Sequence, residues 1–308
     1  MSQLALHRSR LTAFGATATA GMALGVCAYA LFSLHDASIK WLVTGIGMAP
    51  LPVWQVLFFR SVFIMASTVV AGRTAMLERA VRTPLKAKLL GRATITLIAW
   101  LCYYSAARAL PLAQLLTLYF AAPIITTLLA RPLLGERIPP SRWVSVLLGF
   151  AGVVVACDPR GFHLSRAALM VLLAAAFWGT AIILMRQIAR RESSLLQMFY
   201  TNALFAVATG IACVATWTPV GWSQAGLLAA ICCCGGLGQF CLFEGARRAP
   251  ASVMATVEYS ALIWAFILGY VVFGDVPAAP VFAGAALILL AGAWLLWSER
   301  HGAHRLAA

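Results

Sequence analysis

The chain has 308 residues, of which 62% are hydrophobic and only 10% charged, and its formal net charge is +14. Soluble domains are usually about 45–50% apolar and about 25% charged, so this composition excludes a water-soluble globular fold and indicates an integral membrane protein in a lipid bilayer. The positive charge does not indicate a nucleic-acid partner, because the basic residues lie between apolar segments, where they direct membrane topology.

Ten apolar segments follow one another along the chain, and each is a candidate membrane-spanning helix of an all-α fold. Such a helix needs about 20 apolar residues, within a range of about 17–25. The first segment is too long for the apolar region of a secretory signal peptide, so we expect it to be a retained span. The segments are 18–42, 52–71, 93–109, 111–134, 143–157, 167–186, 195–216, 226–246, 250–273 and 280–298. The third and fifth are at or below the required length, which leaves their ends poorly defined.

Lysine and arginine are unevenly distributed between the two sides of this arrangement. With the N-terminus in the cytoplasm, nearly all of those outside the spans lie in cytoplasmic segments, and only Arg108, Arg160 and Arg166 lie on the opposite side. Cytoplasmic segments of membrane proteins carry such an excess. The bias predicts a multi-pass protein of the cell inner membrane with both termini in the cytoplasm.

Two stretches of the chain, Ser105–Glu136 and Glu244–Asp275, are similar when aligned at one constant offset. The alignment pairs Ala107 with Ala246, Arg108 with Arg247, Pro111 with Pro250, Thr117 with Thr256, Gly135 with Gly274 and the acids Glu136 and Asp275. We therefore expect two copies of one five-helix unit, at residues 1–157 and 158–308. Because five spans is an odd number, the second copy enters the membrane inverted, as in many secondary transporters.

Several short motifs strengthen this interpretation: HDASIKWL (His35–Leu42), FFR (Phe58–Arg60), ALPLAQ (Ala109–Gln114), LLGERI (Leu133–Ile138) and GFAGVVV (Gly149–Val155). With them, the chain resembles the EamA type of the drug/metabolite transporter superfamily over almost its whole length. The resemblance implies two inverted five-helix EamA repeats around a central cavity, which the first four helices of each repeat line. It also implies a small-molecule substrate, and fifth and tenth helices that are peripheral or form the contact of a homodimer.

Three ionisable residues lie inside the first two spans: Asp36, Lys40 and Arg60. A charge in a span costs at least about 2.5 kcal/mol and usually faces a cavity or a partner. Asp36 and Lys40 are four residues apart and share one helix face, and Arg60 lies at a similar depth, so Asp36 could pair with either base. These residues are expected to form an ion-pair cluster that fixes the two helices, or a polar wall of the cavity.

Glu258 is the one acid well inside the ninth span, and no basic residue lies one turn away on its own helix. Apolar surroundings favour the neutral form of an acid, so Glu258 is a candidate for proton coupling, cation binding or pairing with a substrate amine. The alternative is a protonated acid hydrogen-bonded to a neighbouring helix. Its repeat-mate is Tyr119, so the two copies differ chemically here. Glu244, by contrast, has Arg247 and Arg248 one turn away, which predicts an ordinary interfacial ion pair.

Aromatic side chains within the spans suit a cavity for flat or amphipathic ligands. By position in the EamA family, the resemblance implies Trp178, Tyr200, Glu258 and Tyr259 as substrate-binding residues, and we add Tyr104 and Tyr119. Pro123 is expected to kink the fourth span.

The chain has none of the motifs of the competing functional classes. It contains no HExxH, no Walker A sequence and no cysteine or histidine spacing typical of a metal site, so we expect no cofactor, no metal and no intramembrane enzyme. The sequence predicts a secondary transporter of small organic metabolites that works by alternating access. The expected direction is export, driven by proton coupling or by exchange. An uptake carrier for S-adenosylmethionine or a vitamin-like solute is the alternative.

Overall fold

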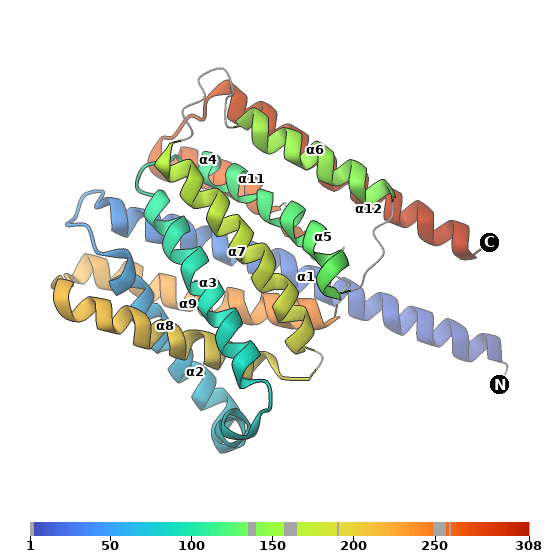
Figure 1. Cartoon of the computed structure of the whole chain (residues 1–308), viewed down its shortest axis with the longest axis horizontal. Coiled ribbons are helices and arrows are strands. Elements are labelled where there is room, and N and C mark those ends of the chain that lie inside the picture. Colours follow the sequence, from blue (N-terminus) through green and yellow to red (C-terminus); the bar gives the residue numbers. More distant parts are fainter. Residues whose placement is uncertain are drawn as a thin grey trace.

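The computed structural model describes residues 3–134, 140–156, 165–189, 191–248, 257–258 and 260–307, and the regular structure of this part of the chain is entirely α-helical. Figure 1 shows the helices packed as one bundle. Their bounds are α1 Gln3–Thr44, α2 Val53–Arg82, α3 Lys86–Ala106, α4 Leu112–Tyr119, α5 Ala121–Leu134, α6 Pro140–Ala156, α7 Arg166–Ala189, α8 Ser194–Thr216, α9 Trp222–Arg248, α11 Ser260–Phe273 and α12 Ala279–Ala307.

These helices coincide with the ten predicted spans, so the all-α, ten-span prediction is confirmed. The fourth span is divided into α4 and α5, and α11 forms the described part of the ninth. The helices α1, α2, α7, α8 and α9 each contain a segment long and apolar enough to cross a membrane. The predicted boundary between the repeats, at residue 157, and the Gly135–Glu136 turn lie outside the described residues.

The two repeats, α1–α6 and α7–α12, are interlocked rather than placed side by side. Extensive packing joins α1 to α9, α3 to α7, α2 to α8 and α6 to α12, and each of these pairs takes one helix from each repeat. If each helix is replaced by its counterpart in the other repeat, α1 becomes α7 and α9 becomes α3, so the pair α1–α9 becomes the pair α7–α3. The pairs α2–α8 and α6–α12 each map onto themselves. Both chain termini lie at one end of the bundle; α1 leads away from that end, whereas α7 leads back toward it (Figure 1). The repeats are therefore inverted, and the centre of the protein is an interface between them.

The break in the fourth span follows from its proline. A proline ring inside a helix clashes with the carbonyl four residues before it, and four residues before Pro123 is Tyr119, the last residue of α4. Phe120 leaves the helical path with ψ of 2°, although its N–H still reaches the carbonyl of Leu116 at 3.1 Å. The predicted kink is thus a discontinuity, and it turns Tyr119 and Phe120 toward the interface of the repeats.

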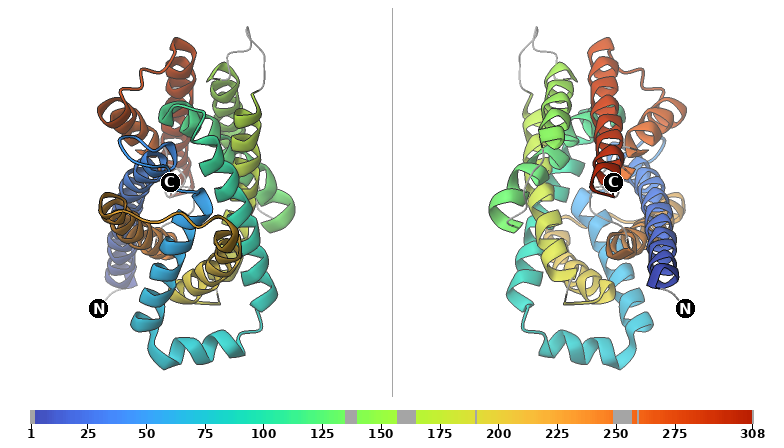
Figure 2. Two further views of the ribbon diagram at one scale, coloured as in Figure 1. Left: turned by 90° about the vertical axis from the view of Figure 1, so that its left-hand side faces the viewer. Right: turned by 90° about the vertical axis from the view of Figure 1, so that its right-hand side faces the viewer.

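The second span also ends at a defined point. Arg73 has a non-helical conformation with φ of 51°, and the rest of α2 lies across the end of the bundle (Figure 2). A Cβ on the preceding residue, Gly72, would lie 2.5 Å from that of Met76, so only glycine allows this bend. Beyond the bend, Arg79 binds the buried Glu192 at 2.9 Å and ties the first repeat to the α7–α8 connection.

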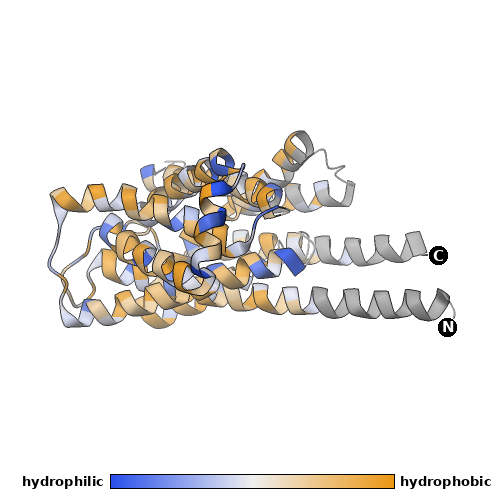
Figure 3. Ribbon diagram, turned by 90° about the horizontal axis from the view of Figure 1, so that it is seen from below, coloured by the Kyte–Doolittle hydropathy of each residue, from blue (hydrophilic) through white to orange (hydrophobic). Residues whose placement is uncertain are grey.

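The exterior of the bundle is suited to lipid. Figure 3 shows hydrophobic residues along the length of the helices. Large apolar side chains point outward on several of them, among them Val70, Leu147, Ile211, Val214 and Val271. In water, a protein with such a surface would aggregate, whereas in a bilayer the surface contacts the hydrocarbon chains of the lipids. The structure therefore agrees with a multi-pass membrane protein.

Candidate functional site

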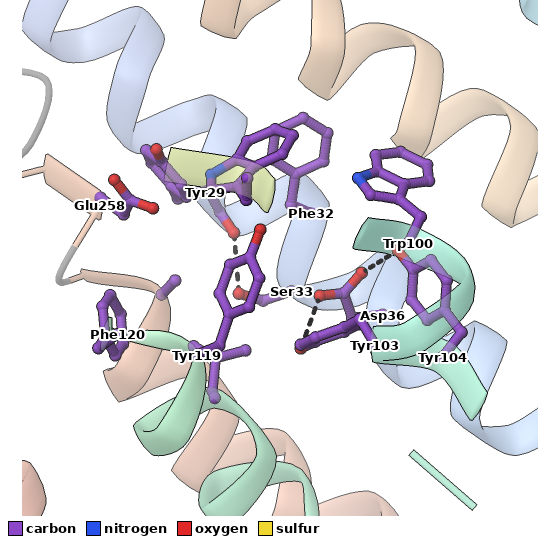
Figure 4. Close-up of a pocket in the computed structure, with 13 residues that line it drawn as sticks. Tyr29, Phe32, Ser33, Asp36, Trp100, Tyr103, Tyr104, Tyr119, Phe120 and Glu258 are labelled. Carbon is purple, nitrogen blue, oxygen red and sulfur yellow. Dashed lines mark hydrogen bonds between the residues drawn. The ribbon is translucent and has the colours of Figure 1, made fainter. Parts of the chain in front are cut away.

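A cavity lies at the interface of the repeats and receives side chains from five helices (Figure 4). It encloses about 630 Å³ of space without protein atoms, a volume that includes open solvent. Eight of its 13 lining residues are aromatic. The lining consists of Tyr29, Phe32, Ser33 and Asp36 of α1; Trp100, Tyr103 and Tyr104 of α3; Leu116, Tyr119 and Phe120 of α4 and its end; Trp178 of α7; and Glu258 and Ala261.

One face of α1 forms the wall that carries most of the polar groups. Tyr29, Phe32, Ser33 and Asp36 are spaced by three or four residues, so their side chains share one side of the helix. The hydroxyl of Ser33 donates to the backbone carbonyl of Tyr29 at 2.8 Å, which leaves Asp36 and Tyr29 as the groups that α1 presents to a ligand.

Asp36 accepts hydrogen bonds from two tyrosines that also line the cavity. The hydroxyl of Tyr104 donates to Oδ1 at 2.8 Å, and that of Tyr103 donates to Oδ2 at 3.3 Å (Figure 4). His35 Nδ1 lies 3.0 Å from Oδ1 as well. The side chain of Asp36 keeps 16% of its surface exposed, so the carboxyl group remains open to the cavity while these three groups hold its orientation.

His35 connects Asp36 to a buried arginine. Arg60 donates from Nε to His35 Nε2 at 2.9 Å. An arginine nitrogen can only donate, so Nε2 of His35 is an acceptor and the ring proton is on Nδ1, facing Asp36. The guanidinium of Arg60 also lies 4.2 Å from the ring centroid of Trp100 and 3.4 Å from Asn202 Oδ1. Arg60 is only 1% exposed and makes no direct contact with the cavity.

The structure therefore corrects the expected pairing of Asp36 with Lys40 or Arg60. Arg60 reaches Asp36 only through His35, and Lys40 binds another acid: its Nζ donates to Asp275 Oδ2 at 2.7 Å. Lys40 is 6% exposed and also packs over the ring of Phe273, outside the cavity. Of the three residues, only Asp36 lines the cavity.

Glu258 lies across the cavity from Asp36, with Tyr29 and Tyr119 close by (Figure 4). The hydroxyl of Tyr29 is within hydrogen-bonding reach of the Glu258 carboxyl group. Tyr119 is the residue that the internal alignment pairs with Glu258, and the two interact electrostatically in the structure. The chemical difference between the repeats thus lies at the interface, within one cavity.

Aromatic rings form a continuous surface between these two acids. The ring of Tyr103 contacts Tyr104 and Tyr119 edge to face, with centroids 5.1 and 5.0 Å away. Tyr119 in turn lies 6.4 Å from Trp178 of the second repeat. Trp178, Tyr104, Tyr119 and Glu258, all expected in the cavity, are therefore brought together.

One expected cavity residue lies elsewhere in the structure, and another cannot be placed. The structure corrects the expectation for Tyr200, whose hydroxyl donates to the carbonyl of Ala80 at 2.7 Å and whose ring packs on Met76 and Leu89 at the end of the bundle. Tyr259 lies outside the described residues. The predicted ion pairs of Glu244 are present, with Arg247 at 2.8 Å and Arg248 at 2.9 Å.

The sequence-based reasoning missed three cavity residues of α1. Tyr29, Phe32 and Ser33 precede Asp36 by seven, four and three residues, so the helical face of Asp36 could have identified them. Trp100 and Tyr103 lie on the face of α3 that carries Tyr104.

Comparison with known proteins gives a consistent result. The sequence profile of the EamA-like transporter family matches residues 11–157 and 165–297. A riboflavin transporter of Rhizobium johnstonii is 26% identical over 96% of both chains. The pseudopaline exporter CntI of Pseudomonas aeruginosa is 28% identical over 88% of this chain and 94% of that protein, and an S-adenosylmethionine uptake transporter of Rickettsia prowazekii is 25% identical over 90% and 93%.

One solved crystal structure superposes with a TM-score of 0.66 over 93% of this chain and 98% of the other. At 19% sequence identity, this similarity supports the fold alone.

Proposed function

Because the chain belongs to the EamA-like transporter family, we propose that it exports a small organic metabolite from the cytoplasm by alternating access. The aromatic cavity between the repeats carries this proposal, since a site at the interface of inverted repeats can open to either side when the repeats move against each other. Export agrees with the name of the Pseudomonas relative; uptake of riboflavin or S-adenosylmethionine, which the names of other relatives suggest, is the alternative.

The proposal includes a location and a topology. We place the chain in the inner membrane with both termini in the cytoplasm, because its basic residues are concentrated on the side of the termini. It acts as a carrier rather than an enzyme, and a homodimer through the peripheral helices α6 and α12 remains a prediction.

Proton coupling at Glu258 is the mechanistic part of the proposal. This acid faces the cavity among the hydroxyls of Tyr29 and Tyr119, with Asp36 as the nearby second acid. A carboxyl group at this position can bind a proton in one orientation of the carrier and release it in the other. Solute movement in one direction would then be driven by protons moving in the other.

The test begins with a thermal-shift screen of the purified protein against a metabolite panel that includes riboflavin and S-adenosylmethionine. Stabilising solutes are then followed in proteoliposomes with and without an imposed proton gradient. We expect gradient-dependent flux in the wild type, and gradient-independent or no flux in Glu258→Gln, which still unfolds cooperatively.

Two outcomes would count against the proposal. Flux no faster than in protein-free liposomes for every stabilising solute would remove the transport assignment. Identical flux and pH dependence in the wild type and in Glu258→Gln would remove only the coupling role of this residue.

A further inference from the structure

The charges that line the cavity are all negative in the described part of the chain. Asp36 and Glu258 lie on its wall, and no lysine, arginine or histidine does. The residues adjacent to Glu258 that lie outside the described part, 249–256 and 259, include no basic side chain in the sequence. Among the residues that the structure describes, a solute in the cavity therefore meets two acids and no fixed cation.

Lys40 and Arg60, the basic residues of the first two spans, do not line the cavity. Lys40 is bound to Asp275 at 2.7 Å, and its nitrogen packs over Phe273. Arg60 lies behind Trp100, whose ring is 4.2 Å from the guanidinium, and it is 1% exposed. Arg60 moderates the charge of Asp36 through His35, but it cannot contact a solute.

The carboxylate of Asp36 has one acceptor position left for a further hydrogen-bond donor. Tyr104, Tyr103 and the Nδ1–H of His35 approach its two oxygens, and a carboxylate has about four acceptor positions. The group also keeps part of its surface open to the cavity. A protonated amine would supply the remaining hydrogen bond and the compensating charge together.

The aromatic wall favours the same kind of ligand. The faces of tyrosine and tryptophan rings carry negative potential and attract cations, most strongly where water is excluded. Trp100, Tyr104 and Tyr119 stand next to or between the two acids, and Trp178 completes the wall from the second repeat.

We propose that the cavity selects organic cations, a protonated amine or another onium group on a flat or aromatic body, with Asp36 as the counter-charge. This inference rests on the proposed function and specifies its substrate class. Anions are rejected by the two acids, and neutral analogues lose the charge-assisted hydrogen bond.

The test uses three probes that share one body and differ in charge: 2-(1-naphthyl)ethylamine, 2-(1-naphthyl)ethanol and 1-naphthylacetate. Binding to the full-length protein in nanodiscs is measured by calorimetry. We expect the amine to bind at least about tenfold more tightly than the alcohol, equivalent to about 1.4 kcal/mol, and the carboxylate not to bind. Equal affinity for amine and alcohol, tighter binding of the carboxylate, or binding of none of the three would overturn the inference.

Asp36→Asn keeps the shape of the side chain and removes its charge, so the preference for the amine over the alcohol should fall to within about threefold, a difference of under about 1 kcal/mol. The matched control is Glu78→Gln, which removes one negative charge from an exposed position outside the cavity. It should retain the full preference. An unchanged preference in folded Asp36→Asn contradicts the role of Asp36, and the three-probe series on the wild type tests the substrate class if that variant does not fold.

The inference and the proposed function fail in different ways. If no solute is transported in proteoliposomes, the transport assignment itself fails. If a neutral or anionic metabolite is transported and the naphthylamine neither binds nor competes, transport stands and the preference for cations is wrong.

Discussion

Lys40 of α1 donates to Asp275 of the α11–α12 connection at 2.7 Å, so the first helix of one repeat is fastened to the end of a helix in the other. The geometry depends on the glycine before the acid. Gly274 ends α11 with φ of +66°, a conformation that other residues rarely adopt, and Asp275 is thereby turned back toward α1. The Gly-acid turn that identified the repeat in the sequence thus supplies one half of an ion pair between the repeats.

This pair should show strong energetic coupling. The side chain of Lys40 is 8% exposed and that of Asp275 is 24% exposed, so removing the acid leaves the more deeply buried charge without its partner. We expect Asp275→Asn to destabilise the protein more than Lys40→Met does. Removing one partner of a buried pair costs about 3–5 kcal/mol, and the loss for Asp275→Asn should fall in this range. The double variant should be less destabilised than the sum of the singles by about 0.5–3 kcal/mol. Thermal unfolding in detergent measures all three, and additive effects would show that the pair contributes no coupling.

The partner of Lys40 illustrates what sequence spacing can and cannot predict. Asp36 and Lys40 share a helix face, but each has a better partner in another part of the chain: two tyrosines of α3 for Asp36, and Asp275 for Lys40. Spacing describes neighbours on one helix. The choice among partners is made by tertiary packing, which brings together residues more than 200 positions apart.

A charge exchange between Asp36 and Arg60 should therefore fail to restore function. His35 separates the two groups, with Arg60 donating to Nε2 at 2.9 Å and Asp36 lying 3.0 Å from Nδ1. In the double variant Asp36→Arg/Arg60→Asp, the arginine cannot accept the hydrogen bonds that Tyr103 and Tyr104 donate to Asp36, and the shorter aspartate loses the contact of Arg60 with Trp100. We expect it to be less stable than either single variant, and solute binding in the thermal-shift screen to be absent. A double variant that binds as the wild type does would show that the two charges interact directly.

Gly235 of α9, in the second repeat, lies directly against this network. A Cβ there would lie 2.6 Å from Arg60 Nε and 3.0 Å from His35 Nε2. Both side chains are buried, so Gly235→Ala should cost about 1–3 kcal/mol of stability through overpacking. The control on the same helix is Gly226→Ala, which meets no atom within 4 Å and should leave the unfolding temperature unchanged or slightly raised. Equal behaviour of the two variants would contradict the close packing of α9 on Arg60.

A second pair of glycines tests the contact between the peripheral helices. A Cβ on Gly152 of α6 would lie 2.7 Å from the carbonyl oxygen of Gly284 of α12, whereas one on Gly149 would meet only ordinary contacts of at least 3.5 Å. Gly152→Ala should therefore lower the unfolding temperature and separate α6 from α12, and Gly149→Ala should not. Comparable unfolding temperatures for the two variants would show that the helices can move apart at no cost.

The architecture was predictable because a bilayer restricts a chain to helices of nearly fixed length, and because duplication leaves an alignable record. That record also anticipated the site in part: Tyr119 and Glu258 are repeat-mates, and both line the cavity. The face of α1 was harder to predict. In a helix that is apolar on all sides, periodicity does not distinguish the face toward a cavity from the face toward lipid, so Tyr29 and Phe32 carry no sequence signal without Asp36 as a reference.

The misplacement of Tyr200 provides a direct test of where the site lies. Its hydroxyl binds the carbonyl of Ala80 far from the cavity, so Tyr200→Phe should cost about 0.5–1.5 kcal/mol of stability and leave the affinity for 2-(1-naphthyl)ethylamine unchanged. Tyr104→Phe is the matched change within the cavity. It removes the 2.8 Å hydrogen bond to Asp36, worth about 1.5–3 kcal/mol for a bond to a charged group, and frees the carboxyl group from its orientation. Calorimetry should show weaker amine binding in Tyr104→Phe only. A loss of affinity in Tyr200→Phe would instead place the site near the N-terminal end of α8.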